Sequence, residues 1–324
     1  MKVLVTGVAG FIGSNTAKYF LEKNYEVVGI DNFNDFYPKK IKEFNISEFK
    51  DNTNFKLITG DILDRSLIKN LFESEKFDFV IHLAAWANVT NSVINPDVYI
   101  HANVEGTNNL AEFGVKNNLK GFIFASTSSV YGNNNVTPFV ENMNTDYPEA
   151  PYPATKKACE VLLYSYNVNF KLKVIPCRIF NPVGERMRPD LALPKLIRSA
   201  IYGTPFPIFM DPAVSMRDYA DVYEIIKTFE SALLTENISY EIVNLGNSSP
   251  RSLVDLKEIV EKITGKNIEI IKDYKPGQMK ETYANVEKAK KLLNYNPSLN
   301  LEQMVEKYYN WFIKQPDWYK KGEY

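Results

Sequence analysis

The stretch KVLVTGVAGFIG, residues 2–13, decides the fold. Its first half is a short apolar run, which is typical of a strand buried on both faces of a parallel sheet. Gly7, Gly10 and Gly13 follow with GxxGxxG spacing, and a helical pattern begins at once. Such glycines let the backbone approach a pyrophosphate, and the helix N-terminus presents free N–H groups to it. The stretch predicts a dinucleotide site; a glycine turn that serves only close packing is the alternative.

The order of strand followed by helix recurs through the first half of the chain. Apolar runs predict strands at residues 2–7, 26–31, 55–61, 78–84, 121–127 and 173–180. Helical patterns lie between them, at residues 11–23, 64–73, 97–117 and 153–170. This alternation predicts an α/β fold with a doubly wound parallel sheet of the Rossmann type and right-handed crossovers.

The pattern changes after residue 180, where the chain becomes rich in proline, arginine and methionine up to residue 216. Further helices are predicted near residues 194–203, 222–234, 252–264, 286–293 and 301–315, with strands at 240–245 and 267–272. We therefore expect two domains. Residues 1–180 and about 217–247 should form the dinucleotide-binding domain. Residues of about 181–216 and 248–324 should form a smaller, discontinuous α/β domain.

Composition excludes several classes of protein. Hydrophobic residues make up 45% and charged residues 24% of 324, as in ordinary globular proteins. The net charge of -1 gives no basic excess for nucleic acid or an anionic membrane. Two cysteines and two histidines are too few for a disulfide framework or a zinc cluster, so we expect no metal. We expect a cytoplasmic enzyme, because no signal peptide or transmembrane run is visible. His82 is interpreted as a hydrogen-bonded core residue.

Two aspartates end predicted strands on the dinucleotide side. Asp31 follows Gly13 by 18 residues, where a carboxylate can accept both hydroxyls of an adenosine ribose and repel a 2′-phosphate. This position favours NAD over NADP. Asp61 ends the third strand and is placed to reach the adenine ring, with a plain strand-end cap as the alternative.

A tyrosine and a lysine form the candidate catalytic pair. Tyr152 and Lys156 are four residues apart at the start of a predicted helix, so they share one helical face. A neighbouring cation stabilises a phenolate and lowers the tyrosine pKa, and a positively charged nicotinamide lowers it further. Upstream, the hydroxyl cluster Ser126-Thr127-Ser128-Ser129 ends a predicted strand.

Together these motifs resemble the extended short-chain dehydrogenases/reductases, over essentially the whole chain. The resemblance implies that Thr127, Tyr152 and Lys156 are catalytic and that Asn103 supports the site near the nicotinamide. A helix-interior amide bonded to a carbonyl is the alternative for Asn103. The resemblance implies NAD as cofactor, bound by Gly7, Gly10, Phe11, Ile12, Gly13, Asp31, Asn32, Asp61, Ile62, Leu83, Ala84, Ala85, Asn103, Tyr152, Lys156 and Phe180.

Within that family the chain resembles nucleotide-sugar epimerases. Residues 178–184, RIFNPVG, and Arg217-Asp218-Tyr219 resemble UDP-galactose 4-epimerases, in which Asn181 and Arg217 would bind the substrate diphosphate. Residues 186–192, RMRPDLA, and 31–37, DNFNDFY, resemble UDP-glucuronate 4-epimerases, in which Arg188 would meet a diphosphate or a sugar carboxylate. A solvated surface charge is the alternative for each arginine. Lys275 stands where a second diphosphate arginine is expected.

The resemblance implies an NAD-dependent 4-epimerase that oxidises a UDP-sugar transiently to a 4-keto intermediate. UDP-glucuronate and UDP-galacturonate are the predicted pair, ahead of UDP-glucose/galactose or N-acetyl sugars. Ser128 and Ser129 stand where related decarboxylases and dehydratases have carboxylates. This argues against a decarboxylase and against a dehydratase, because a hydroxyl cannot replace a carboxylate as an acid or base near neutral pH. A 4-keto reductase and a non-catalytic NAD-binding sensor remain alternatives. Two helices, about residues 97–117 and 153–170, should pair the chain into a homodimer.

Overall fold

The computed structural model describes residues 1–133, 135–208, 216–272 and 281–324. Its main element is a seven-stranded sheet in which every pairing is parallel. The order β11-β6-β5-β4-β1-β2-β3 confirms the predicted doubly wound fold. Its strands are β1 (Lys2–Thr6), β2 (Glu26–Asp31), β3 (Phe55–Thr59), β4 (Phe79–His82), β5 (Gly121–Thr127), β6 (Val174–Ile179) and β11 (Val243–Leu245). The chain runs outward from β1 to β3 and then returns to β4. In such sheets ligands bind at the carboxyl ends of the strands, where the order reverses.

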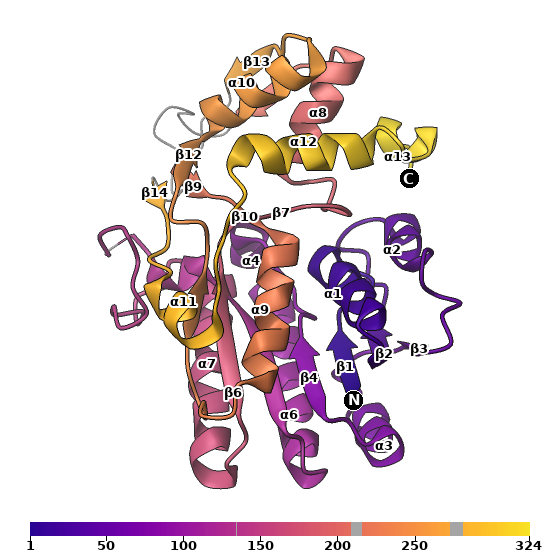
Figure 1. Cartoon of the computed structure of the whole chain (residues 1–324), viewed down its shortest axis with the longest axis vertical. Coiled ribbons are helices and arrows are strands. Elements are labelled where there is room, and N and C mark those ends of the chain that lie inside the picture. Colours follow the sequence, from indigo (N-terminus) through magenta and orange to yellow (C-terminus); the bar gives the residue numbers. More distant parts are fainter. Residues whose placement is uncertain (134, 209–215, 273–280) are drawn as a thin grey trace.

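Helices cover both faces of the sheet (Figure 1). One layer contains α1 (Phe11–Glu22) and α9 (Val222–Leu234); the other contains α3 (Arg65–Glu75), α6 (Gly106–Lys116) and α7 (Pro151–Phe170). Along β1, Val3 and Val5 join the core beneath the first layer, whereas Leu4 joins the core beneath the second. Burial of alternate side chains on opposite faces explains why the strands are apolar without interruption.

The single helix predicted over residues 97–117 is divided in the structure. It consists of α5 (Pro96–Tyr99), the π-helical segment η1 (Ile100–Glu105) and α6. Within this stretch the Thr107 hydroxyl donates to the Asn103 carbonyl at 2.5 Å, and the Asn103 side chain bonds outside the helix. Side chains that compete for backbone groups in this way are a recognised cause of irregular helix turns.

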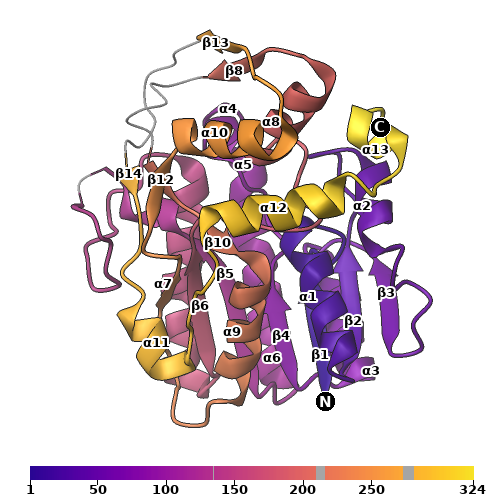
Figure 2. The ribbon, with the colours of Figure 1, turned by 45° about the horizontal axis from the view of Figure 1, so that its top comes forward.

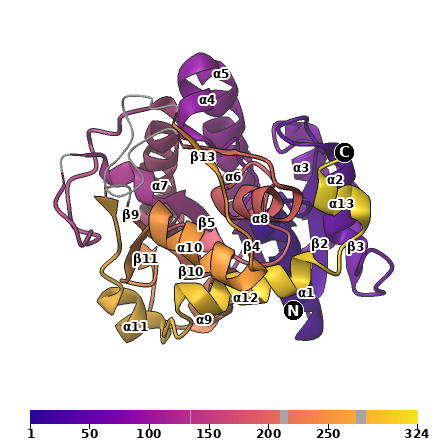
Figure 3. The same cartoon turned by 90° about the horizontal axis from the view of Figure 1, so that it is seen from above.

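A second group of elements lies over the carboxyl ends of the sheet strands (Figure 2, Figure 3). Its helices are α8 (Ala192–Tyr202), α10 (Leu253–Thr264), α12 (Leu301–Phe312) and α13 (Asp317–Lys321). Its strands are β7 (Pro182–Val183), β8 (Phe206–Ile208), β9 (Met216–Asp218), β10 (Ala220–Asp221), β12 (Pro250–Ser252), β13 (Ile270–Lys272) and β14 (Glu281–Thr282). The predicted strand over residues 267–272 is therefore shorter than expected, since β13 begins at residue 270. The two-residue strands were not predicted, because they are too short to show a period.

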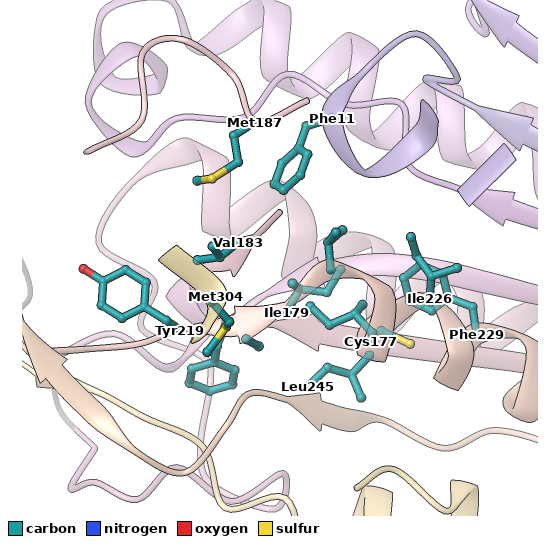
Figure 4. Close-up of a cluster of buried hydrophobic side chains, with 14 of the residues drawn as sticks. Phe11, Cys177, Ile179, Val183, Met187, Tyr219, Ile226, Phe229, Leu245 and Met304 are labelled. Carbon is teal, nitrogen blue, oxygen red and sulfur yellow. The ribbon is translucent and has the colours of Figure 1, made fainter. Parts of the chain in front are cut away.

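One continuous apolar cluster joins the two groups of elements (Figure 4). Cys177 and Leu245 from the sheet pack in the same cluster as Val183, Tyr219 and Met304 from the second group. In addition α11 (Glu287–Leu293), which the sequence places in the smaller domain, packs against β11 and α9 of the sheet layer. The two-domain division stays a prediction.

Candidate active site

The glycine loop leads from β1 into α1 without room for side chains. Gly7 has φ +67°, and a Cβ atom there would lie 2.8 Å from the backbone nitrogen of Ala84. A Cβ atom on Gly13 would lie 2.1 Å from the carbonyl oxygen of Gly7. Gly10, the N-cap of α1, offers no side-chain hydrogen bond to the helix. The first N–H groups of α1 are thus left for an anion, as a pyrophosphate requires.

Asp31 ends β2 and is nearly buried beside this loop. One carboxylate oxygen accepts from the Ala9 N–H at 3.0 Å, and the other accepts from the Phe33 N–H at 2.8 Å. Burial raises the pKa of Asp31, while these N–H groups and the charge of Lys42 oppose the rise. Because each carboxylate oxygen accepts more than one hydrogen bond, capacity remains for two ribose hydroxyls.

Asp61 faces the same cavity from the end of β3. Its carboxylate accepts from the Asn32 side chain at 2.7 Å and from the Leu63 N–H at 2.9 Å. The second bond caps the local turn, which was the alternative interpretation of this residue. The glycine loop, Asp31 and Asp61 together fit the pyrophosphate, ribose and adenine of a dinucleotide.

Lys42 was missed by the sequence analysis, and so was its helix α2 (Lys39–Ile46). Its ammonium group is buried and donates to the backbone and side-chain oxygens of Asn34 at 2.7 and 2.6 Å. Burial lowers the pKa of Lys42, and the charge of Asp31 opposes that change. Lys42 therefore holds the segment that follows Asp31 against the cavity wall.

The catalytic candidates meet at the end of β5 and the start of α7. Lys156 donates to the carbonyl of Ala125 at 2.8 Å and lies 4.8 Å from the centre of the Phe124 ring. Burial lowers the pKa of Lys156 to about 8. Burial raises the pKa of Tyr152, and a hydrogen bond with Thr127 and the charge of Arg188 oppose the rise. The raised pKa keeps the phenol protonated at neutral pH without a bound ligand, and any further positive charge placed beside the ring favours the phenolate.

Asn103 lies behind this wall instead of lining it. Its amide nitrogen donates to the Trp86 carbonyl at 3.1 Å and to the Thr155 hydroxyl at 3.0 Å. Its amide oxygen accepts from the Trp86 N–H at 2.9 Å. Asn103 therefore ties the turn after β4 to α7. The alternative interpretation, a helix-interior amide bonded to a carbonyl, accounts only for the bond to the Trp86 carbonyl.

Phe180 does not line the cavity, so its side chain is not placed to bind the cofactor directly. Its ring is fully buried near Tyr131 and Phe139. The Phe180 N–H donates to the Leu245 carbonyl at 3.0 Å, which continues the strand pairing and turns the ring into the core. The neighbouring residues Ile179 and Asn181 do face the cavity.

A cavity of about 1050 Å³ brings the other predicted residues together. Those lining it are Gly7, Gly10, Phe11, Ile12, Gly13, Asp31, Asn32, Asp61, Ile62, Leu83, Ala84, Ala85, Thr127, Ser128, Ser129, Tyr152, Lys156, Asn181, Arg188 and Arg217. Lys275 lies outside the described residues. Unpredicted side chains also line the cavity, among them Phe36, Tyr37, Lys42, Glu149 and Thr282. They come from loops and short elements whose sequence has no periodic pattern.

Charged and hydroxyl side chains form a second part of the cavity wall, which we call the arginine end and which contains Arg188, Arg217, Ser128 and Ser129. Arg188 lies over the Phe36 ring at 5.0 Å, and its guanidinium donates twice to Asp190, at 3.1 and 3.0 Å. Arg217 donates to the Met216 carbonyl at 2.8 Å, and burial lowers the pKa of Arg217. Ser128 and Ser129 lie in η2 (Ser128–Tyr131), directly after Thr127. This end is suited to an anionic, hydroxylated ligand.

His82 is a core residue, as interpreted from the sequence, and Cys159 and Cys177 also lie in the core. His82 lies between the hydroxyls of Thr6 and Thr107, and both thiols are buried and free. In the described ranges no three His, Cys, Asp or Glu side chains are arranged to hold a metal ion. None of the described helices combines the length and apolar character needed to cross a bilayer.

Comparison with known proteins identifies the family. A family model described as GDP-mannose 4,6 dehydratase matches residues 4–308. A UDP-glucuronate 4-epimerase of Thermodesulfobacterium geofontis is 37% identical over 311 residues, which cover 95% of each chain.

Two solved structures have the same architecture. A UDP-glucuronic acid 4-epimerase from Bacillus cereus, solved with UDP-glucuronic acid and NAD, superposes with a TM-score of 0.91 at 35% identity and 100% coverage of both chains. A UDP-glucose 4-epimerase from Thermotoga maritima, solved with UDP-glucose, gives a TM-score of 0.89 at 28% identity, covering 97% of this chain and 99% of that one. This chain belongs to the GDP-mannose dehydratase-like family of short-chain dehydrogenases/reductases, which includes the UDP-glucuronate 4-epimerases.

Proposed function

We propose that this protein is an NAD-dependent UDP-sugar 4-epimerase whose substrates are UDP-glucuronate and UDP-galacturonate. The observation that carries the proposal is that one cavity brings the two sets of residues together. Its wall combines a dinucleotide end, built from the glycine loop and Asp31, with Thr127, Tyr152 and Lys156. The relatives named as UDP-glucuronate 4-epimerases support the substrate class.

The acid–base work falls to the catalytic side chains. Tyr152, as phenolate, takes the proton of the sugar 4-hydroxyl, while Thr127 donates a hydrogen bond to that oxygen. Lys156 stabilises the phenolate by its charge. When bound by the glycine loop and Asp31, NAD would supply the acceptor for the hydride of C4 and the donor for its return. Tyr152 then returns the proton to the 4-oxygen, and inversion at C4 results if the sugar has turned over in between.

Turning the sugar requires that the rest of the substrate stays bound. We assign this role to Arg217 and Asn181, which would hold the diphosphate. A guanidinium suits phosphate oxygens because it presents a planar fork of N–H donors. Lys275 is proposed as a further cation for the diphosphate on the sequence resemblance alone.

The preference for a uronate sugar rests on Arg188 and the two serines. A C6 carboxylate can accept hydrogen bonds from Ser128 and Ser129 and pair with Arg188. Loss of CO2 from a 4-keto uronate requires the carboxylate charge to flow into the ring. Charge-assisted hydrogen bonds that hold the charge on the carboxylate raise that barrier.

A neutral sugar is the second candidate. Asn181 and Trp86 suit UDP-glucose or its N-acetyl form equally well, and one solved neighbour is a UDP-glucose 4-epimerase. The test is a side-by-side rate measurement on UDP-glucuronate, UDP-glucose and UDP-N-acetylglucosamine, with the Ser128→Ala variant as comparison. We expect UDP-glucuronate to react fastest, and Ser128→Ala to slow it more than the others. A preference for a neutral sugar that Ser128→Ala leaves unchanged would overturn the uronate assignment.

A homodimer in the cytoplasm completes the proposal. Val161, Tyr164 and Val168 form an exposed, largely apolar stripe along α7, with spacings of three and four residues that place them on one face. Both cysteines are free thiols, in keeping with a reducing compartment. Light scattering should give twice the chain mass, and Val161→Glu should shift it to the monomer. A monomeric unmutated protein would contradict the dimer.

A further inference from the structure

His82 links three functional segments through one chain of hydrogen bonds. It ends β4 and is 1% exposed. Its Nδ1 atom lies 2.7 Å from the Thr6 hydroxyl at the end of β1, and its Nε2 atom lies 2.9 Å from the Thr107 hydroxyl on α6. The rings of Phe122 and Phe124 flank the imidazole, with centroids 5.9 and 5.8 Å away.

Counting donors and acceptors shows which group donates in each of these hydrogen bonds. The Thr6 oxygen accepts from the N–H groups of Leu83 and Ala84, at 3.1 and 3.0 Å. A hydroxyl oxygen has two lone pairs, so both are used and the Thr6 proton must be donated to His82 Nδ1. The ring proton is then on Nε2 and is donated to the Thr107 oxygen. Thr107 in turn donates its proton to the Asn103 carbonyl at 2.5 Å.

Both ends of this series of hydrogen bonds lie at the proposed active site. Leu83 and Ala84 line the cavity beside the glycine loop. At the other end, Asn103 belongs to η1, and its side chain holds Trp86 and Thr155, next to Lys156. The Thr107 hydroxyl holds the Asn103 carbonyl where the helix is irregular. The same histidine thus fixes the turn after β4 and the helix that carries Asn103.

We propose that His82, as the neutral Nε2–H tautomer, is a positioning residue that sets the cofactor-facing turn 83–86 and the Asn103 segment relative to each other. The expected effect of His82 on kcat rests on the proposed epimerase function. The expected tautomer and the expected effect on NAD binding do not depend on that function.

The neighbourhood keeps the ring neutral. Burial lowers the pKa of His82 well below its ordinary value, and the positive charge of Lys156 adds to the effect. Cys159 also faces this site and donates to the Asn103 carbonyl at 3.2 Å. A protonated ring would have two donors, and the Thr6 oxygen has no lone pair left to accept one.

Nitrogen NMR of the histidines tests the tautomer directly. The chain has only His82 and His101, so two sets of signals are expected, and exposed His101 serves as the reference. His82 should show a neutral ring with the proton on Nε2, unchanged between about pH 5 and 8. A proton on Nδ1, or protonation within that range, would overturn the proposal.

Variants test the positioning role. His82→Phe removes both hydrogen bonds, whereas the amide oxygen and nitrogen of His82→Gln can replace the two ring nitrogens. We expect His82→Phe to weaken NAD binding and to lower kcat, each roughly tenfold, which corresponds to about one net hydrogen bond. His82→Gln should restore most of both. Cys177→Ala, at a buried site in the core on the opposite face of the sheet, should lower Tm without changing NAD affinity or kcat.

A purely structural histidine would behave like the Cys177 control, with lower Tm and unchanged NAD affinity and kcat, and that result would overturn the proposal. If His82→Phe does not fold, the variants Thr107→Val and Thr107→Ser test the positioning role instead. Loss of kcat in the valine variant and its return in the serine variant support the proposal; equal kcat in both contradicts it. If the unmutated protein converts no UDP-sugar, the proposed function fails, and NMR and NAD titration still decide on His82.

Discussion

The two ends of the cavity are built differently. At the glycine-loop end, Gly7 and Gly13 are closed in by backbone, and Asp31 is fixed by two N–H groups. At the other end, Arg188 pairs with its own neighbour Asp190, and Ser128 brings a rotatable hydroxyl. We infer that the first arrangement suits a ligand held in one position. The second can exchange partners, as an enzyme requires if its sugar must turn over between two half-reactions.

The largest effect should come from the proposed catalytic tyrosine. Tyr152→Phe removes the proton acceptor and keeps the ring, so turnover should fall by about 10²–10⁴-fold while NAD stays bound. Tyr202→Phe, at an exposed tyrosine that does not line the cavity, is the matched control and should keep normal turnover. Steady-state rates with UDP-glucuronate measure both. Near-normal turnover in Tyr152→Phe would eliminate the mechanism.

Lys156→Met should move the pH profile. Lys156, whose pKa is lowered to about 8, carries its charge at neutral pH and favours the phenolate of Tyr152 there, so kcat/KM should rise with pH as Tyr152 loses its proton and level off as Lys156 loses its charge. Without it, the pKa of Tyr152 increases, and this limb should shift to higher pH by about one unit or more. At neutral pH the variant is therefore slower, and part of the loss should return in alkaline buffer. An equal loss of kcat/KM at every pH, with no shift of its rise with pH, would contradict this role of Lys156.

The glycine-loop end is tested by Asp31→Ala. Loss of two hydrogen bonds to a carboxylate should weaken NAD by roughly 10–100-fold, and loss of its charge should relax the discrimination against NADP. Asp51→Ala, at an exposed position, is the control and should leave both affinities unchanged. Titration with each dinucleotide provides the measurement. If the unmutated protein binds NADP more tightly than NAD, our interpretation of Asp31 is wrong.

The smallest effects should come from the arginine end. Arg188→Lys keeps the charge and loses the fork, so the KM for UDP-glucuronate should rise by about tenfold, with NAD affinity unchanged. Asp190→Asn frees Arg188 from an exposed ion pair and should lower that KM, by about two- to threefold. If both variants change KM in the same direction, Arg188 does not exchange Asp190 for the substrate as its partner.

Sequence alone predicted the sheet because both of its faces are buried. Uninterrupted apolar runs predicted β1 to β6, and the glycine spacing predicted a dinucleotide site after β1. Strands such as β7 and β14 have two residues each and pair with segments far along the chain, so no local pattern indicates them. Their register depends on tertiary packing.

Residues that line the cavity were predicted from the sequence where chemistry restricts the residue type. Tyr152, Lys156 and Asp31 belong to spacings that few other structures require, and all three line the cavity. Lys42 was missed because a lysine in a short polar helix is expected to be exposed, whereas here Asn34 satisfies its buried charge. Phe180 was expected at the cofactor, but strand pairing turns its ring into the core.

The most direct test is to incubate the purified protein, without added cofactor, with UDP-glucuronate carrying deuterium at C4. The proposed reaction removes and returns the same hydride within one cavity. UDP-galacturonate should therefore form with the deuterium still at C4, and no CO2 should be released. Absence of interconversion despite bound NAD, or a product that has lost the label to solvent, would contradict the proposed function.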